Sequence, residues 1–350
     1  MQRSEPFRLI LRLAGFLPLV FAIALGNWAL NTAVVLRWEM RGANSAADAM
    51  LQGQSIWTDE DGALKFAAVA RLPRPRDVLI LGGSRAAQIS ASWFSPKSAL
   101  NLAFAAAGLD DAVSLFEECT EVKRVPRLVL LELDPQLVHE RLPPNWSADV
   151  YYFNKALARY GLKQRRSGDG LLSVERLKSG LQLLAGMQWK AVPDDYAGFH
   201  VLQDGSWGLP LAQRNAVPAE IDAFVAANLG KLDADMIRWR MTSRPGEFGR
   251  ELLRHFLDDL ESHHTRVVVF LAPIHHLAYE FYTKRGGYDD SWIRAEMAAR
   301  DITVAGSYSP YATRATSGDF MDEAHPRAPI IYRLLREAGV VGTPLHTPPS

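Results

Sequence analysis

The stretch "VLILGGSRAAQIS", residues 78–90, decides how this chain folds. Its four leading apolar residues run directly into Gly82, Gly83 and Ser84. A short apolar run that ends at turn residues is typical of a buried strand in a parallel sheet. Ligands bind such sheets at the carboxyl ends of the strands. The sequence therefore predicts that Ser84 lies where a functional site would form.

Four further segments share this strand pattern, and segments with helical apolar spacing lie among them. The predicted strands are 98–104, 127–135, 266–273 and 301–308. Strands that alternate with helices favour a parallel sheet covered on both faces. The predicted fold class is therefore α/β, with three layers in the order α/β/α.

Composition sets the broad class of the protein. The chain has 350 residues, of which 48% are hydrophobic and 22% charged, as expected of a globular protein. Its formal net charge is zero, so electrostatics give no reason to expect a nucleic-acid partner. Cys119 is the only cysteine, which excludes an intramolecular disulfide and argues against a cysteine-based zinc site.

The N-terminal region has the pattern of a membrane anchor. Residues 13–36 contain no charged side chain, and as a helix they would extend about 36 Å, enough to cross a hydrocarbon core of about 30 Å. Arg3, Arg8 and Arg12 precede this run and place residues 1–12 in the cytoplasm. A cleaved signal peptide and a buried core helix are the alternatives.

The rest of the chain divides by composition. Residues 37–76 are mixed and polar, and we expect a juxtamembrane connector with short helices. The α/β domain is expected over 77–340. Amphipathic stretches separated by polar, glycine-containing turns predict a helical insertion over about 140–245. Residues 341–350 are expected to form a flexible tail.

The sequence around Ser84 fits none of the common glycine motifs. It lacks the spacing of a Walker loop or of a dinucleotide-binding fingerprint. Ala86 stands where the nucleophile elbow of α/β-hydrolases has a glycine. Taken alone, the pattern is equally consistent with a helix N-cap serine.

A second motif, "DFMDEAHPRAPIIY" at 319–332, changes this balance. Asp322 and His325 are three residues apart, and Pro326 follows at once. A serine nucleophile needs a base to accept its proton and a carboxylate to orient that base. A turn after the last strand would place both groups at the same end of the sheet as Ser84. A solvated acidic turn is the alternative.

Four blocks in this order resemble those of the SGNH/GDSL hydrolase superfamily. They are "VLILGGSR", "NLAFAAAG", "LVLLELDP" and "DEAHP", within about 77–335. The chain is similar above all to the membrane-anchored branch, which includes periplasmic alginate O-acetyltransferases and the D-alanyl transfer protein of teichoic acid. The resemblance implies a flavodoxin-like α/β/α fold of SGNH type. It also implies Ser84 as nucleophile, His325 as general base and Asp322 as the residue that orients it, with the Gly108 and Ser84 backbone N–H groups as oxyanion donors.

The third block departs from the family pattern. The standard block carries Gly-x-Asn-Asp, whose Asn donates to the oxyanion, whereas this chain has Leu133, Asp134 and Pro135. An ionised Asp has no donor, and losing one oxyanion donor costs about 100-fold or more in turnover. We therefore expect Asn101, Arg85 or another group to substitute, or catalysis to be slow. Asp134 is a candidate substrate contact or a cap of the strand end.

Other residues are candidates for substrate binding. His275 and His276 follow the fourth strand and are candidate substrate contacts. Adjacent histidines at a strand end usually point apart, and the sequence shows no further ligands, so neither a metal nor a cofactor is predicted. Trp146, Trp189 and Trp207 could line a glycan groove or pack in a core.

The function that the resemblance implies is acyl transfer outside the cytoplasm. The expected protein spans the bacterial inner membrane once and transfers an acyl group, by expectation acetyl, to a hydroxyl of a cell-surface polysaccharide. A multispan membrane O-acyltransferase is the expected donor partner. A carbohydrate esterase with the same triad and a non-catalytic polysaccharide-modification subunit are the alternatives.

Overall fold

The computed structural model describes seven parts of the chain. They are residues 16–26, 40–95, 97–134, 147–162, 187–209, 216–232 and 246–342. Trp146 and most of the expected span 13–36 lie outside these parts. A helix covers 16–26, with Phe16 and Phe21 more than half exposed. Among the described residues, no helix combines the length and apolarity needed to cross a bilayer.

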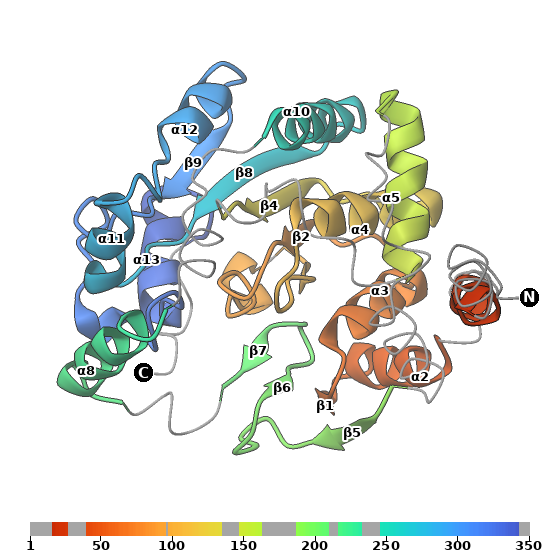
Figure 1. Ribbon diagram of the computed structural model, residues 1–350, viewed down its shortest axis with the longest axis horizontal. Coiled ribbons are helices and arrows are strands. Elements are labelled where there is room, and N and C mark those ends of the chain that lie inside the picture. Colours follow the sequence, from red (N-terminus) through yellow and green to blue (C-terminus); the bar gives the residue numbers. More distant parts are fainter. Residues whose placement is uncertain are drawn as a thin grey trace, which may run out of the picture.

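Five parallel strands form the central sheet (Figure 1). They are β2 (Val78–Leu81), β3 (Ala99–Asn101), β4 (Leu128–Glu132), β8 (Arg266–Leu271) and β9 (Thr303–Gly306). Their order in the sheet is β3-β2-β4-β8-β9, which in chain order is 2-1-3-4-5, the order of flavodoxin-like sheets. All five predicted strands are therefore present, and the α/β fold class is confirmed.

The sheet is buried on both faces because alternate residues of each strand point to opposite sides. In β2, Leu79 and Leu81 pack into one hydrophobic core, whereas Val78 and Ile80 pack into another. The first core holds α4 (Leu109–Glu121), α10 (Glu247–Ser262) and α12 (Ser291–Ala298) against the sheet, and the second holds α13 (Ala328–Glu337). This arrangement gives the three layers that the sequence predicted.

The segment expected as a connector is instead part of the domain. It forms α2 (Met40–Leu51), β1 (Ser55–Thr58) and α3 (Asp61–Arg71). The two helices pack on one another through small and apolar side chains. Ala46, Ala47, Met50, Leu64 and Phe66 are all at most 1% exposed. The short helices predicted for this segment are therefore present, but they pack into the hydrophobic core of the domain and do not form a separate connector.

A second sheet joins this segment to the insertion. Its antiparallel order is β5-β1-β6-β7, with β5 (Trp189–Val192), β6 (His200–Val201) and β7 (Trp207–Gly208). It lies at the bottom of Figure 1, below the central sheet. The insertion therefore contains strands as well as helices α5 (Ser147–Tyr160) and α8 (Pro218–Leu229), and the purely helical prediction for it was incomplete.

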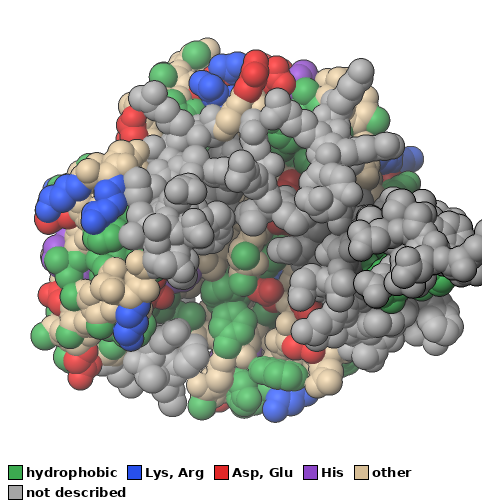
Figure 2. All heavy atoms as spheres, in the orientation of Figure 1, with side chains coloured by type: hydrophobic (Ala, Val, Ile, Leu, Met, Phe, Trp, Pro, Cys, Tyr) green, Lys and Arg blue, Asp and Glu red, His purple; other side chains and the backbone are tan. Residues whose placement is uncertain are grey.

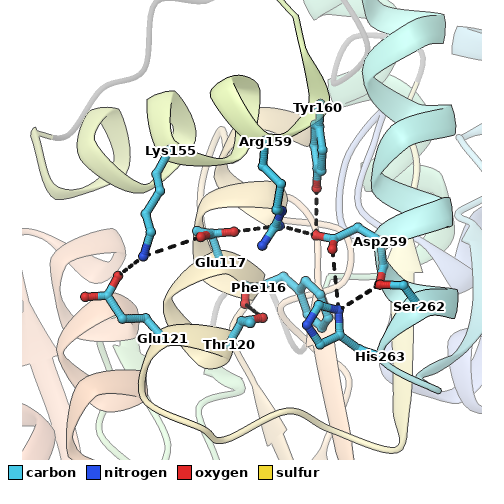
Figure 3. A network of polar contacts seen from close by, with 10 residues as sticks. All are labelled: Phe116, Glu117, Thr120, Glu121, Lys155, Arg159, Tyr160, Asp259, Ser262 and His263. Carbon is cyan, nitrogen blue, oxygen red and sulfur yellow. Dashed lines mark hydrogen bonds and ion pairs between the residues drawn. The ribbon is translucent and has the colours of Figure 1, made fainter.

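A charged network holds α5 against α4 and α10 (Figure 3). Arg159 bridges Glu117 of α4 and Asp259 of α10, and the Tyr160 hydroxyl donates to Asp259 at 2.9 Å. Lys155 adds ion pairs to Glu117 and to a second glutamate of α4. Both bridged carboxylates are almost fully buried, and Arg159 offsets part of the cost of removing them from water. The network fixes the described start of the insertion to the sheet domain.

Candidate active site

The turn that carries Ser84 follows β2 directly. Residues 84–88 form turns rather than a helix, so the helix N-cap alternative for Ser84 was wrong. Gly82 adopts a φ of +143°, and a Cβ there would lie 2.6 Å from Cβ of Glu132 on β4. Only glycine combines this conformation with this close approach. The glycine pair therefore allows the chain to turn sharply and present the serine.

Glu132 anchors this turn from the neighbouring strand. Its Oε2 accepts a hydrogen bond from the Gly83 N–H at 2.8 Å, and its side chain is buried. Burial raises the pKa of Glu132 to about 7, as does the charge of Asp134, while Arg85 and the Gly83 N–H oppose the shift. A charged residue in an otherwise apolar strand was the sequence signal for this role, and sequence reasoning missed it.

The wild-type protein should lose stability between pH 5 and pH 7.5 because Glu132 titrates in this range. Glu132→Gln is expected to reduce this loss. With a raised pKa, the folded state keeps a proton that the unfolded state has released, so stability falls as pH rises from about 4.5 to about 7. The amide keeps the acceptor for Gly83 and cannot titrate. Urea unfolding gives the free energy of unfolding at each pH. Its change between the two pH values should be smaller in the variant than in the wild type by on the order of 2 kcal/mol.

The matched control is Glu251→Gln, on the exposed surface of α10. That variant should retain the pH dependence of the wild type. If Glu132→Gln retained it as well, Glu132 would not be the group that titrates.

The segment after β9 brings the second motif to Ser84. β9 is at one edge of the sheet, and β2 is three strands away. The chain crosses back along the carboxyl ends of the strands. The Tyr308 hydroxyl donates to the Leu133 carbonyl after β4 at 2.6 Å, and Gln88 Nε2 donates to the Pro326 carbonyl at 2.8 Å. These contacts fix both ends of the crossing.

Ser84, His325 and Asp322 form a continuous hydrogen-bonded chain. Ser84 Oγ lies 2.8 Å from His325 Nε2, and His325 Nδ1 lies 2.8 and 2.9 Å from the two Asp322 carboxylate oxygens. The carboxylate fixes the ring proton on Nδ1, which leaves Nε2 to accept from the serine hydroxyl. All three side chains are partly exposed, so a substrate can reach them.

The Asp322 carboxylate is itself held by the turn. Its Oδ1 accepts from the backbone N–H groups of Ala324 and His325 at 2.8 and 2.9 Å. Burial alone would raise the pKa of Asp322, but the His325 ring and these N–H groups outweigh it, so the pKa lies below its usual value. Asp322 therefore stays ionised, as a residue that stabilises an imidazolium must.

Arg85, which follows Ser84 in the turn, forms a buried ion pair with Asp134. Their side chains are 6% and 8% exposed, and Arg85 Nη2 also donates to the Tyr288 hydroxyl at 3.0 Å. Burial disfavours the charge of Arg85, but Asp134, Tyr288 and Glu132 outweigh this, and its pKa is raised. The expected contact of Arg85 or Asp134 with substrate therefore has no support here, because the two groups are buried against each other.

Two expected oxyanion donors are also engaged elsewhere. Both amide hydrogens of Asn101 donate to backbone carbonyls, of Ala86 at 2.9 Å and of Ile89 at 2.8 Å. The Gly108 N–H donates to Asp111 Oδ2 at 2.6 Å, at the start of α4. Asn101 therefore stabilises the segment that follows the nucleophile, and Gly108 caps a helix. Of the expected donors, the Ser84 N–H remains.

A pocket of about 380 Å³ opens beside Asp322 and His325. Its remaining lining residues are Thr58, Asp59, Asp61, Ala105, Phe199, Trp207, Leu209 and Met321. The rings of Phe199 and Trp207 meet edge to face at 4.5 Å. Hydrophobic and acidic side chains lie together on this part of the surface, over the small sheet (Figure 2). The second sheet thus builds one wall of the site, which sequence reasoning did not foresee.

Trp189 and the two histidines occupy different places. Trp189 Nε1 donates to Ser45 Oγ at 3.1 Å, away from the pocket lining. His275 is fully buried at the start of α11 (His276–Thr283), where its Nδ1 accepts from the Leu277 N–H at 3.3 Å. Neither His275 nor His276 lines the pocket, so their expected substrate contact has no support there.

The chain was compared with protein-family models and with curated proteins. No protein-family model matches the chain, and no curated protein matches it. The resemblance to the SGNH/GDSL superfamily stays a prediction that rests on the four sequence blocks. The hydrogen-bonded chain of Ser84, His325 and Asp322, with the pocket beside it, is the basis for the proposals below.

Proposed function

We propose that the protein is a serine-dependent O-acyltransferase that acts on a carbohydrate hydroxyl. The observation that carries this proposal is the 2.8 Å contact between Ser84 Oγ and His325 Nε2, with Asp322 on the other ring nitrogen. A serine next to a base that a carboxylate orients is the arrangement of covalent acyl transfer.

The reaction has two half-reactions. Ser84 Oγ attacks the carbonyl carbon of an activated acyl donor while His325 Nε2 accepts the hydroxyl proton, and the Asp322 charge stabilises the imidazolium. Collapse of the tetrahedral intermediate expels the leaving group, which takes the proton from His325. The acceptor hydroxyl then attacks the seryl ester, His325 takes its proton, and the return of that proton to Ser84 Oγ releases the product ester.

The pocket is suited to the acceptor. Its volume falls within the range of small-molecule sites, and it adjoins the base that would deprotonate an acceptor hydroxyl. Aromatic rings such as Phe199 and Trp207 offer apolar faces to sugar rings, and carboxylates such as Asp59 accept hydrogen bonds from hydroxyls. Its walls therefore match a polyhydroxylated acceptor.

The proposed location follows from the sequence. Residues 13–36 would anchor the chain in the bacterial inner membrane, with the domain in the periplasm and a cell-surface polysaccharide as acceptor. A multispan membrane O-acyltransferase would supply the acyl group. The SGNH type of the fold is part of the same proposal, supported by the sheet order and the positions of the three residues.

The proposed function is tested by following the acetyl group of a donor to its product. The purified chain is incubated with an aryl acetate, with and without an oligosaccharide, and both acetylated sugar and free acetate are measured. Transfer to sugar that requires Ser84 is the expected result. Release of free acetate alone would identify an esterase. Neither product, or products that persist in Ser84→Ala, would contradict the proposal.

The acceptor is expected to be a neutral or amino sugar rather than a uronic acid. Three carboxylates line the pocket, and the described lining residues include no Lys or Arg. An anionic acceptor would meet like charge, at a cost that salt reduces. Initial rates at low ionic strength should give a KM for uronic-acid oligosaccharides at least about 10-fold above that for neutral ones.

Asp59→Asn should bring the KM for uronic-acid oligosaccharides closer to the KM for neutral ones. Glu251→Gln, on the exposed surface of α10, should leave the ratio of the two KM values unchanged. Equal KM values for both acceptor classes in the wild type would show that the pocket does not select by charge.

A further inference from the structure

Three potential metal ligands converge at the carboxyl end of β8. Asp222 comes from α8, whereas His275 and His276 lie where the chain leaves β8 and enters α11. One ligand atom from each residue lies within 4.8 Å of the other two. The sequence analysis expected the two adjacent histidines to point apart and found no third ligand. The structure corrects both points.

The His275 ring is the centre of this group. Its side chain is fully buried, and Nε2 lies 2.9 Å from Asp222 Oδ1. The two atoms form an ion pair, and both are shielded from solvent. A ring nitrogen and a carboxylate oxygen held this close are arranged like two ligands of one ion.

The spacing suits a small divalent cation. Nitrogen and oxygen ligands bind Zn²⁺ at about 2.0–2.2 Å, so neighbouring ligands of one ion lie roughly 3.0–3.5 Å apart. The 2.9 Å pair is close to this range. The rings of His275 and His276 are 4.4 Å apart between centroids. His276 is only partly buried, so its side chain can rotate the short distance that remains.

We propose that Asp222, His275 and His276 bind a divalent transition-metal ion of the Zn²⁺ class. Two imidazoles and a carboxylate match the preferences of this class, and water would complete the coordination. Binding through His275 Nε2 places the ring proton on Nδ1. The ion would replace the direct contact between His275 Nε2 and Asp222, and the 3.3 Å contact from the Leu277 N–H would be given up.

The ion would connect the insertion to the catalytic turn. Asp222 lies on α8, which belongs to the insertion. The backbone N–H of His275 donates to the carbonyl of Glu323 at 3.1 Å, and Glu323 is next to Asp322. The His275 ring also packs against Phe320 at 5.4 Å. Metal binding would therefore stabilise the turn that holds Asp322 and His325, without contacting the acyl group.

The test measures metal binding directly and does not depend on enzyme activity. The full chain is treated with a chelator, dialysed, and titrated with Zn²⁺. We expect one ion per chain, a Zn²⁺-dependent rise in melting temperature, and slower amide exchange over residues 319–326. Co²⁺ should give a visible absorption band. His276→Ala and Asp222→Asn should each weaken binding at least 10-fold.

His264→Asn is the matched control, because this exposed histidine lies at the opposite end of β8. Its binding should equal that of the wild type. The partly exposed positions of His276 and Asp222 favour folded variants, which the melting temperature of the metal-free proteins checks. Fewer than about 0.1 Zn²⁺ per chain would overturn the proposal, as would unchanged binding in both variants. Both results are independent of whether acyl transfer occurs.

Discussion

Ser84→Ala is expected to lower the rate of aryl acetate turnover by at least about 10⁴-fold. The alanine removes the atom that would form the acyl-enzyme, while the pocket and the Asp322–His325 pair remain. The rate left over should be that of water attack in the pocket. The check is kcat for aryl acetate hydrolysis, with and without oligosaccharide acceptor.

Ser92→Ala is the matched control, since Ser92 is exposed and interacts with the neighbouring Ser90. It should keep the wild-type rate within about twofold. The melting temperature of Ser84→Ala should also stay close to that of the wild type, because the Ser84 side chain is only partly buried. A Ser84→Ala protein that keeps most of the wild-type rate would exclude the proposed covalent mechanism.

Arg85→Ala is expected to lower the free energy of unfolding by about 3–5 kcal/mol. Removing the guanidinium leaves the buried Asp134 carboxylate without the cation that offsets its charge, and Tyr288 loses its hydrogen-bond donor. Urea unfolding monitored by circular dichroism measures the change. Activity should fall as well, because Arg85 follows Ser84 directly in the same turn.

Two further variants serve as a control and as a test of the Arg85–Asp134 pair. Arg127→Ala removes an exposed arginine whose distance to Asp77 is 3.9 Å, and should change stability by less than about 0.5 kcal/mol. Adding Asp134→Ala to Arg85→Ala should recover part of the lost stability, because the buried carboxylate that Arg85 offsets is then removed as well. A loss below about 1 kcal/mol for Arg85→Ala would show that the pair contributes little.

The sequence was informative where patterns are local. Each strand of the central sheet is a short apolar run bounded by turn residues, and such runs indicate buried parallel strands without knowledge of their neighbours. The spacing of Asp322 and His325 also reports a local geometry, because one turn places both side chains together. Their contact with Ser84 then follows from the rule that sites form at the carboxyl ends of parallel strands.

What sequence reasoning missed depends on long-range pairing. β1 pairs with β5 through Ser55 and Val192, more than a hundred residues apart, and β6 and β7 have only two residues each. Such short strands leave no periodic signal. Asp222 likewise meets His275 only because α8 packs near α11. The role of Asn101 was mistaken because a sequence shows that an amide is near a site, and not which carbonyls it will bind.

The role of Ser84 as nucleophile is tested most directly by the intact mass of the protein after exposure to a serine-directed phosphonate. We expect one adduct per chain in the wild type, slower labelling in His325→Ala, and no adduct in Ser84→Ala. A wild-type protein that stays unlabelled, or an adduct of the same mass and rate in Ser84→Ala, would contradict the assignment of Ser84 as the nucleophile.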